Sequence, residues 1–144
     1  MKVKILPSKT SGEVSAPPSK SFAHRYLIGS VLSCGKCVIK NIADSDDISA
    51  TLSCIEQLGG SVTKDGNIVT VIPTNEKQIE NAVFDCKESG STLRFFIPVV
   101  LATGAKNCTF LGRERLLARG IKEYEKPFEN SDVKIKSDEK SIEV

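Results

Sequence analysis

The chain has 144 residues, 40% of them apolar and 26% charged, which is the balance of a folded soluble protein and excludes a disordered one. Twenty basic and 18 acidic residues leave a formal net charge of +2, too small for the broad positive field of a nucleic-acid-binding protein. No apolar run approaches the length of about 18 residues that spans a membrane, and the first residues lack the features of a signal peptide. We therefore expect a cytoplasmic protein that binds neither nucleic acid nor membrane.

The cysteines favour the same compartment. Their number is odd and they are scattered through apolar segments, which indicates reduced thiols that fill the core: Cys34, Cys37, Cys54, Cys86 and Cys108. Cys34 and Cys37 form a C-x-x-C pair, for which redox or metal chemistry is the alternative. This pair follows a predicted helix instead of opening one, and a single histidine supplies few further ligands, so we expect neither a metal site nor a cofactor.

In the first half of the chain, apolar periodicity predicts a strand near Val14, a helix over 19–34 and a strand over 37–42. A second helix over 46–58 and two short strands over 61–63 and 68–72 follow. Helix-capping and turn residues support these boundaries: D-S-D-D at 44–47 offers an N-cap with acidic residues in the first turn, and Gly59-Gly60 stops the helix.

In the second half the same order of elements returns. We predict a strand over 83–85, a helix over 90–103, a strand over 107–111, a helix over 121–130, and strands over 133–136 and 141–144. Each half therefore reads β-α-β-α-β-β, with equivalent residues about 70 positions apart. The expected fold is α/β (α+β), built from two copies of one unit at about 14–74 and 83–144.

The first helix of each copy is apolar on nearly every side, as buried helices are, but begins with polar residues. Lys20 stands in the first helical turn, where a cation opposes the helix dipole, and this placement suggests an anionic partner. Ser21 and Arg25 are i,i+4 neighbours beside it. Together the hydroxyl and two cations could hold one phosphate or carboxylate. The alternative is that Lys20 and Arg25 are ordinary solvated surface charges.

The second helix start has the sequence E-S-G-S-T at 88–92. Gly90 has no side chain, so a ligand could approach the backbone there, although a simple N-cap with a permissive glycine is the alternative. Three more arginines, Arg113, Arg115 and Arg119, follow a strand end, where loops commonly face a ligand. Each of them could instead form a surface ion pair.

Four motifs, in order along the chain, resemble the N-terminal third of 5-enolpyruvylshikimate-3-phosphate synthase. They are P-S-K-S-x-x-x-R at 18–25, D-S-D-D at 44–47, E-S-G-S-T-L-R at 88–94 and G-R-E-R-L-L-A-R at 112–119. UDP-N-acetylglucosamine enolpyruvyl transferase is similar in fold but typically has Lys-Asn in place of Lys20-Ser21. It is therefore the weaker match.

The resemblance implies a transferase of the shikimate pathway of aromatic amino-acid and chorismate biosynthesis. Such an enzyme joins the enolpyruvyl group of phosphoenolpyruvate to the 5-hydroxyl of shikimate 3-phosphate and releases phosphate. By resemblance, Lys20 contacts both substrates, Ser21 and Arg25 bind shikimate 3-phosphate, and Gly90 and Arg115 line the phosphoenolpyruvate site. No catalytic acid or base is assigned within this chain, and glyphosate, which competes with phosphoenolpyruvate in this family, is the implied inhibitor.

The resemblance also implies an inside-out α/β barrel of six βαβαββ units in two lobes, about two of which are present here. The family is about three times longer, so the chain corresponds to an N-terminal portion that would be inactive without the C-terminal lobe. Two alternatives remain. The chain could be a stand-alone or split anion-binding module without its own catalysis, or a purely structural α/β domain in which Lys20 is dispensable.

Overall fold

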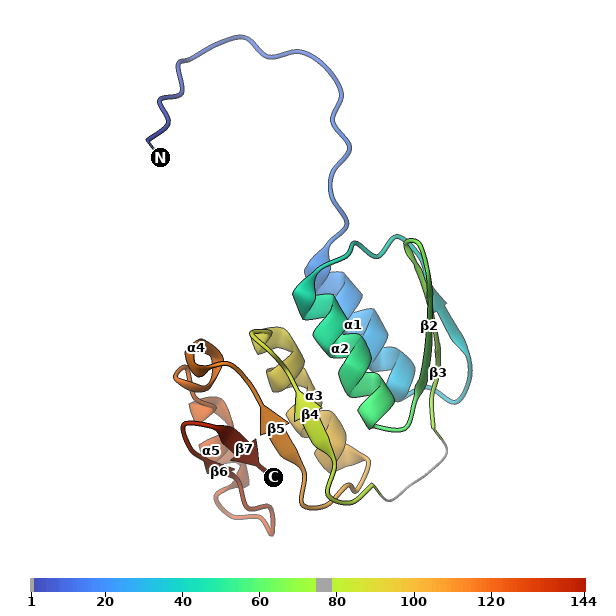
Figure 1. Cartoon of the computed structure of the whole chain (residues 1–144), viewed down its shortest axis with the longest axis vertical. Helices are drawn as coiled ribbons and strands as arrows, with labels where there is room; N and C mark the ends of the chain where they lie inside the picture. Colours follow the sequence, from blue (N-terminus) through green and yellow to red (C-terminus); the bar gives the residue numbers. More distant parts are fainter. Residues whose placement is uncertain (1, 75–78) are drawn as a thin grey trace.

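The computed structural model of the chain describes residues 2–74 and 79–144. Three helices, α1 (Lys20–Val31), α2 (Asp46–Gln57) and α3 (Gly90–Ala102), occupy the middle of the molecule between two β-sheets (Figure 1). The helices contact one another pairwise, and α2 contacts strands of both sheets. The result is a layered α/β fold, as the order of elements predicts.

The first sheet has the order β1-β3-β2 and is antiparallel throughout. Its strands are β1 (Cys37–Ile39), β2 (Ser61–Asp65) and β3 (Ile68–Ile72), and β2 and β3 form a hairpin. Successive side chains of a strand point to opposite faces, and Val69 and Val71 of β3 are fully buried on the face that α1 and α2 cover.

The second sheet has the order β4-β5-β7-β6. Its strands are β4 (Val83–Asp85), β5 (Thr109–Leu111), β6 (Lys136–Ser137) and β7 (Ser141–Glu143). β4 and β5 are parallel because α3 connects them as a crossover, whereas β7 is antiparallel to both β5 and β6. Two short helices, α4 (Glu114–Leu117) and α5 (Lys122–Phe128), lie between β5 and β6 in the chain.

One hydrophobic core joins the two halves. In the second sheet Phe84, Phe110 and Ile142 lie opposite one another on adjacent strands, and all three are fully buried. The ring centroids of Phe84 and Phe110 are 5.0 Å apart, and Phe96 of α3 packs against Phe84 at 6.0 Å. Burial of this aromatic cluster fixes α3 on the sheet, and so fixes where the N-terminus of α3 lies.

The strand expected near Val14 is not formed. The segment from residue 2 to 18 contains no strand, and the Val14 side chain is 98% exposed. Val14 is the single apolar residue in S-G-E-V-S and two prolines follow at 17 and 18, so the segment has no apolar face with which to pair against β1. The first sheet consequently has three strands where we expected four.

Two predicted strands are shorter than expected, for the same physical reason. The strand expected over 37–42 ends at Ile39, and the one expected over 107–111 begins at Thr109. Asn41 and Asn107 have positive φ values of 62° and 53°, a left-handed conformation that asparagine tolerates and that a strand excludes. The strand expected over 133–136 is instead Lys136–Ser137, and α4 was not predicted.

The structure also bears on the state of the cysteines and on membrane-spanning helices. All five cysteines are free, and the thiols of Cys54, Cys86 and Cys108 are buried. A hydrogen bond with Cys54, together with burial, strongly raises the pKa of Cys86. Among the helices that the structure describes, none is long and apolar enough to cross a membrane.

Candidate anion site at the helix N-termini

The N-termini of α1, α2 and α3 lie at the same end of the molecule, because the three helices run in the same direction (Figure 1). Each begins after a serine whose side chain accepts a hydrogen bond from a backbone N–H in the first turn: Ser19, Ser45 and Ser89. Such caps satisfy one orphan N–H per helix and leave others unpaired. Because the three helices run in the same direction, the positive ends of their dipoles lie at the same end of the molecule.

Lys20 lies in the first turn of α1, as predicted, and its side chain reaches α2. Its Nζ lies 2.9 Å from Oδ2 of Asp47, and the two side chains are 53% and 34% exposed. Asp47 is in the first turn of α2, where a carboxylate favours the helix dipole. Lys20 is thus a half-exposed cation that is held at the junction of two helix starts.

Arg25 lies one turn further along α1 and reaches α3. Its Nη1 donates to the backbone carbonyl of Ser21 at 2.9 Å, and its guanidinium carbon lies 5.3 Å from the centre of the Phe95 ring. Both Ser21 and Arg25 are exposed. The stacked ring and the carbonyl orient the guanidinium while leaving donors for a ligand.

Gly90 begins α3, and basic side chains surround the place where a Cβ would stand. That position is 3.1 Å from Nη1 of Arg94 and 3.8 Å from Nη1 of Arg119, with Leu116 also at 3.8 Å. Two guanidinium groups therefore converge on the first residue of α3. Neither Arg94 nor Arg119 was among the residues that we assigned to a substrate from the sequence.

The two arginines next to Gly90 differ in their partners. Arg94 forms an ion pair with Glu123 and donates from Nη2 to the carbonyl of Gly120 at 3.2 Å. A backbone hydrogen bond and then the interactions with Arg94 lower the pKa of Glu123. Within the described part of the chain Arg119 has no side-chain hydrogen bond or ion pair, so its charge is available to an anion near Gly90.

The remaining arginines of the segment 112–119 lie nearby. Arg113 forms a long ion pair of 3.7 Å with Glu88, which precedes the N-cap of α3. Arg115, which we expected beside Gly90, is exposed on α4. The three heavy atoms nearest to the missing Cβ of Gly90 belong instead to Arg94, Arg119 and Leu116. Arg115 therefore stays a prediction.

A buried polar chain beneath these starts was not predicted. The ring Nδ1 of His24 lies 2.8 Å from Oγ1 of Thr51. Oγ1 of Thr51 in turn lies 2.7 Å from Oγ1 of Thr92. The Thr92 hydroxyl donates a hydrogen bond to Oγ of Ser89 at 2.7 Å. The four side chains are at most 2% exposed. Burial lowers the pKa of His24 below its ordinary value of 6.5; the Asp47 carboxylate acts in the opposite direction, and Lys20 and Arg25 lower the pKa further.

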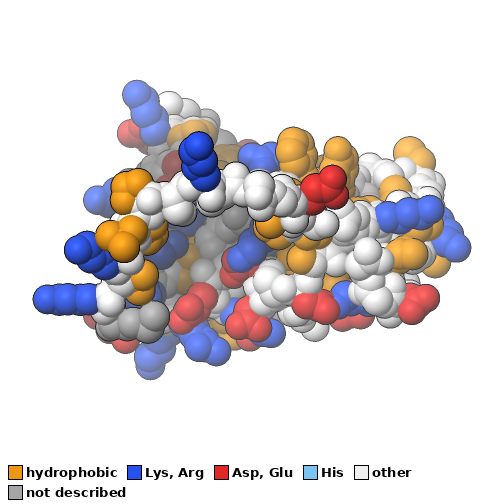
Figure 2. Space-filling view, turned by 90° about the horizontal axis from the view of Figure 1, so that it is seen from above, with side chains coloured by type: hydrophobic (Ala, Val, Ile, Leu, Met, Phe, Trp, Pro, Cys, Tyr) orange, Lys and Arg blue, Asp and Glu red, His pale blue; other side chains and the backbone are white. Residues whose placement is uncertain are grey.

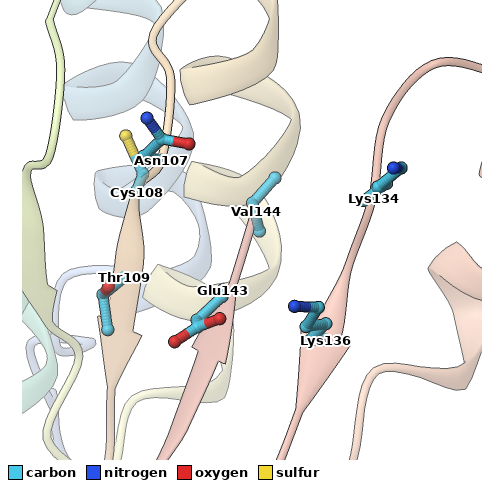
Figure 3. Close-up of a pocket in the computed structure, with 7 residues that line it drawn as sticks. All are labelled: Asn107, Cys108, Thr109, Lys134, Lys136, Glu143 and Val144. Atoms are coloured by element: carbon cyan, nitrogen blue, oxygen red, sulfur yellow. The ribbon is translucent and has the colours of Figure 1, made fainter.

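A separate hollow lies on the outer face of the second sheet (Figure 3). It has a volume of about 350 Å³, and its lining includes Thr109 of β5, Glu143 of β7 and Lys136 of β6, which form a row across adjacent strands. The neighbouring residues Phe110 and Ile142 point to the opposite, buried face. This hollow therefore faces away from the helices and contains none of the predicted site residues.

The surface at the helix N-termini carries charges of both signs. Figure 2, which views the molecule from above Figure 1, shows lysine and arginine side chains interspersed with acidic ones. Recognition of an anion here must therefore come from individual groups such as Lys20 and Arg25, in agreement with the small net charge. Among residues 2–74 and 79–144, no three His, Cys, Asp or Glu side chains lie close enough to hold a metal ion.

Comparison with known proteins identifies similar sequences along nearly the whole chain. The family model described as EPSP synthase (3-phosphoshikimate 1-carboxyvinyltransferase) matches residues 6–144. The 3-phosphoshikimate 1-carboxyvinyltransferase of Clostridium novyi (strain NT) is 40% identical, with 94% of this chain and 33% of the relative covered. The protein of the same name in Clostridioides difficile (strain 630) is also 40% identical, over 99% of this chain and 35% of the relative.

Solved structures show the same fold. Two structures of EPSP synthase from Acinetobacter baumannii superpose with TM-scores of 0.73 and 0.72 at 19% identity, and cover 92% and 91% of this chain. Each alignment covers 32% of the solved chain. The chain thus spans about a third of the length of the relatives that it matches.

Proposed function

The chain belongs to the EPSP synthase family, and on that premise we propose that it supplies the shikimate 3-phosphate site and one side of the phosphoenolpyruvate site of a 3-phosphoshikimate 1-carboxyvinyltransferase. The proposed reaction transfers the enolpyruvyl group of phosphoenolpyruvate to the 5-hydroxyl of shikimate 3-phosphate and releases phosphate. Because the chain spans about a third of the length of its relatives, the reaction is proposed for an assembly that includes the C-terminal lobe, and not for this chain alone.

The observation that carries the proposal is the position of Lys20 at the shared end of α1 and α2. A cation there opposes the dipole of α1, and the ion pair with the partly exposed Asp47 contributes little to stability. An anionic ligand would offset the repulsion and bind both the ammonium and the free N–H groups. We assign the phosphate and hydroxyl groups of shikimate 3-phosphate to Lys20, Ser21 and Arg25.

The N-terminus of α3 fits the second substrate. Phosphoenolpyruvate is small and strongly anionic, and Gly90 lets it approach the backbone N–H groups of α3 closely. Arg119, whose guanidinium lies beside Gly90, and Arg115 on the same segment supply the opposing positive charge. Lys20 stands between the two substrates, where it would contact both.

The proposed contribution of this chain to catalysis is positioning and charge stabilisation. Fixed cations hold the two anionic substrates at a common place and stabilise the charge that develops as the enol ether is protonated. We assign no acid or base for proton transfer within the chain. The proposed location is the cytoplasm, since five free cysteines fit a reducing compartment.

A chimeric enzyme tests the function. The aligned N-terminal segment of the Clostridium novyi relative is replaced by this chain, and phosphate release from phosphoenolpyruvate and shikimate 3-phosphate is measured. We expect turnover that Lys20→Met abolishes and that Lys36→Met, at an exposed position after α1, leaves intact. A folded chimera without turnover, or one in which Lys20→Met is as active as the parent, contradicts the proposal. Binding by this chain without any turnover in the chimera would favour the anion-binding module.

A further inference from the structure

The ring of His24 is a titratable group that is buried among the three helix starts. His24 is 1% exposed, and its Nδ1 contacts Thr51. Its other nitrogen, Nε2, is buried without a hydrogen-bond partner among the described residues. A buried polar atom without a partner costs free energy, so its presence requires an explanation.

We assign the ring proton of His24 from the directions of the surrounding hydrogen bonds. The hydroxyl of Thr92 donates to Ser89 Oγ at 2.7 Å. A hydroxyl has a single proton, so Thr92 must accept from Thr51 across their 2.7 Å contact. Thr51 has then used its proton, and the Nδ1 of His24 must be the donor in the remaining contact.

The backbone carbonyl of Asp47 is a second possible acceptor for both threonine hydroxyls, but its contacts are weaker. The Asp47 carbonyl lies 3.2 Å from Oγ1 of Thr51 and 3.4 Å from Oγ1 of Thr92, longer than the contacts within the chain of side chains. The assignment leaves a bare lone pair on Nε2, and an unused buried acceptor is more common than an orphaned buried N–H. His24 is therefore a neutral imidazole with its proton on Nδ1.

The series of hydrogen bonds from His24 to Ser89 crosses from the first half of the molecule to the second. His24 belongs to α1, Thr51 to α2, and Thr92 and the N-cap Ser89 to α3. His24 is one helical turn below Lys20, and Ser89 immediately precedes Gly90. This series of hydrogen bonds thus connects the two halves of the proposed site. Its side chains are shielded from water and salt, unlike the solvent-accessible ion pair of Lys20 and Asp47.

We propose that His24 is a positioning residue: its Nδ1–H begins a one-way series of hydrogen bonds through Thr51 and Thr92 to Ser89 that sets the distance between the Lys20 end of α1 and the Gly90 end of α3. This inference rests on the proposed function, because that function requires a fixed distance between the two helix ends, at which the two anionic substrates are held side by side. Among the described residues, the charged groups that act on the ring are Asp47 in the first turn of α2, Lys20 in the first turn of α1 and Arg25 one turn further along α1.

The first experiment reads the ring directly and needs no ligand. His24 is the single histidine of the chain, so long-range ¹H–¹⁵N spectra of the unaltered protein report one imidazole. We expect the Nδ1–H form at neutral pH. The Nε2–H form would reverse every hydrogen bond in the series and overturn the inference, whether or not the protein binds shikimate 3-phosphate.

The second experiment breaks the series at its middle. Thr51→Val removes the hydroxyl and keeps the shape, whereas Thr51→Ser keeps the hydroxyl and is the matched control. We expect Thr51→Val to move the backbone amide resonances of Ser89 and Gly90 and to weaken shikimate 3-phosphate binding by about fivefold, and Thr51→Ser to restore both. Unmoved Ser89 and Gly90 amides in Thr51→Val, or failure of Thr51→Ser to restore them, would contradict a positioning role.

Two substitutions of His24 distinguish a positioning role, which needs the N–H donor, from a role in packing alone. His24→Asn keeps an N–H donor close to the Nδ1 site, while His24→Leu fills the space without one. We expect the Ser89 and Gly90 amide resonances of His24→Asn to stay nearer to those of the parent than the resonances of His24→Leu. Equal displacement in both variants would indicate a role in packing alone and would overturn the inference.

Discussion

The ammonium of Lys20 lies 2.9 Å from the Asp47 carboxylate, so the first residue of α1 is joined to the first turn of α2. Asp47 is at a favourable place for a negative charge and Lys20 is at an unfavourable place for a positive one. The pair is consequently a local arrangement that an incoming anion can reorganise, because the Lys20 ammonium can turn from the carboxylate to a phosphate.

Replacing Lys20 by methionine separates binding from stability. We expect the free energy of unfolding to change by no more than about 0.5 kcal/mol, since an exposed ion pair and an unfavourable dipole interaction nearly cancel. The dissociation constant for shikimate 3-phosphate should rise by about tenfold or more. Urea unfolding and a calorimetric titration measure the two quantities, with Lys36→Met as the control. Unchanged affinity in Lys20→Met would favour the purely structural alternative.

Gly90→Ala tests the second half of the site. The added methyl would stand 3.1 Å from Nη1 of Arg94, the end of a flexible side chain that can shift by a few tenths of an ångström. We therefore expect the variant to fold and to bind shikimate 3-phosphate normally. In the chimeric enzyme, glyphosate inhibition should weaken more than turnover with phosphoenolpyruvate does. Equal glyphosate inhibition constants for the glycine and alanine enzymes would show that Gly90 does not line that site.

The pH dependence of stability follows from His24. Burial lowers its pKa in the folded state below the ordinary 6.5, so the unfolded chain binds the proton more readily. The stabilisation from the neutral ring is complete above pH 6.5 and is lost as the pH falls below that value. Urea unfolding between about pH 5 and 7 should show a steeper loss in the parent than in His24→Asn, which has no titrating ring. Identical slopes would contradict a buried neutral histidine.

The aromatic core offers a matched pair of substitutions. Phe110 is fully buried between Phe84 and Ile142, whereas Phe22 on α1 is 61% exposed and stacks on Tyr26. We expect Phe110→Ala to lower the free energy of unfolding by about 3–5 kcal/mol, and Phe22→Ala to lower it by less than about 1 kcal/mol. Comparable losses in urea unfolding would show that the core does not lie where we place it.

Local signals predicted the helices well. Ser19 and Ser45 are the N-caps in the motifs that predicted the starts of α1 and α2. α2 ends at Gln57, and its C-cap Leu58 directly precedes the glycine pair 59–60. These features act over a few residues and are therefore visible in the sequence. The strand near Val14 failed for the complementary reason, since one apolar residue cannot specify a partner strand.

The sequence drew attention to the basic residues of α1, because a cation at a buried helix start contradicts the local rules of stability. Their role in binding a substrate stays a prediction. The hydrogen bonds of His24, Thr51 and Thr92 were missed, because the three residues are distant in sequence and each alone resembles an ordinary polar side chain. Arg119 was considered among the nearby arginines, but only tertiary packing brings its guanidinium within 3.8 Å of the missing Cβ of Gly90.

We also propose that the chain contains two repeats, at about 14–74 and 83–144. The strand order β1-β3-β2 corresponds to β5-β7-β6, with antiparallel pairing at each step. β4, parallel to β5, has no counterpart beside β1 within the described residues. The first repeat, as the structure describes it, therefore lacks the opening strand that β4 supplies to the second.

The central claim is that the N-terminal ends of α1 and α3 form one receptor for small phosphorylated acids, and a titration of the ¹⁵N-labelled chain with shikimate 3-phosphate tests it most directly. We predict saturable chemical-shift changes that cluster at Lys20, Ser21, Arg25 and Gly90 and that inorganic phosphate reproduces only in part. The absence of any shift at millimolar ligand, or shifts confined to the outer face of the second sheet around Lys136 and Glu143, would contradict it.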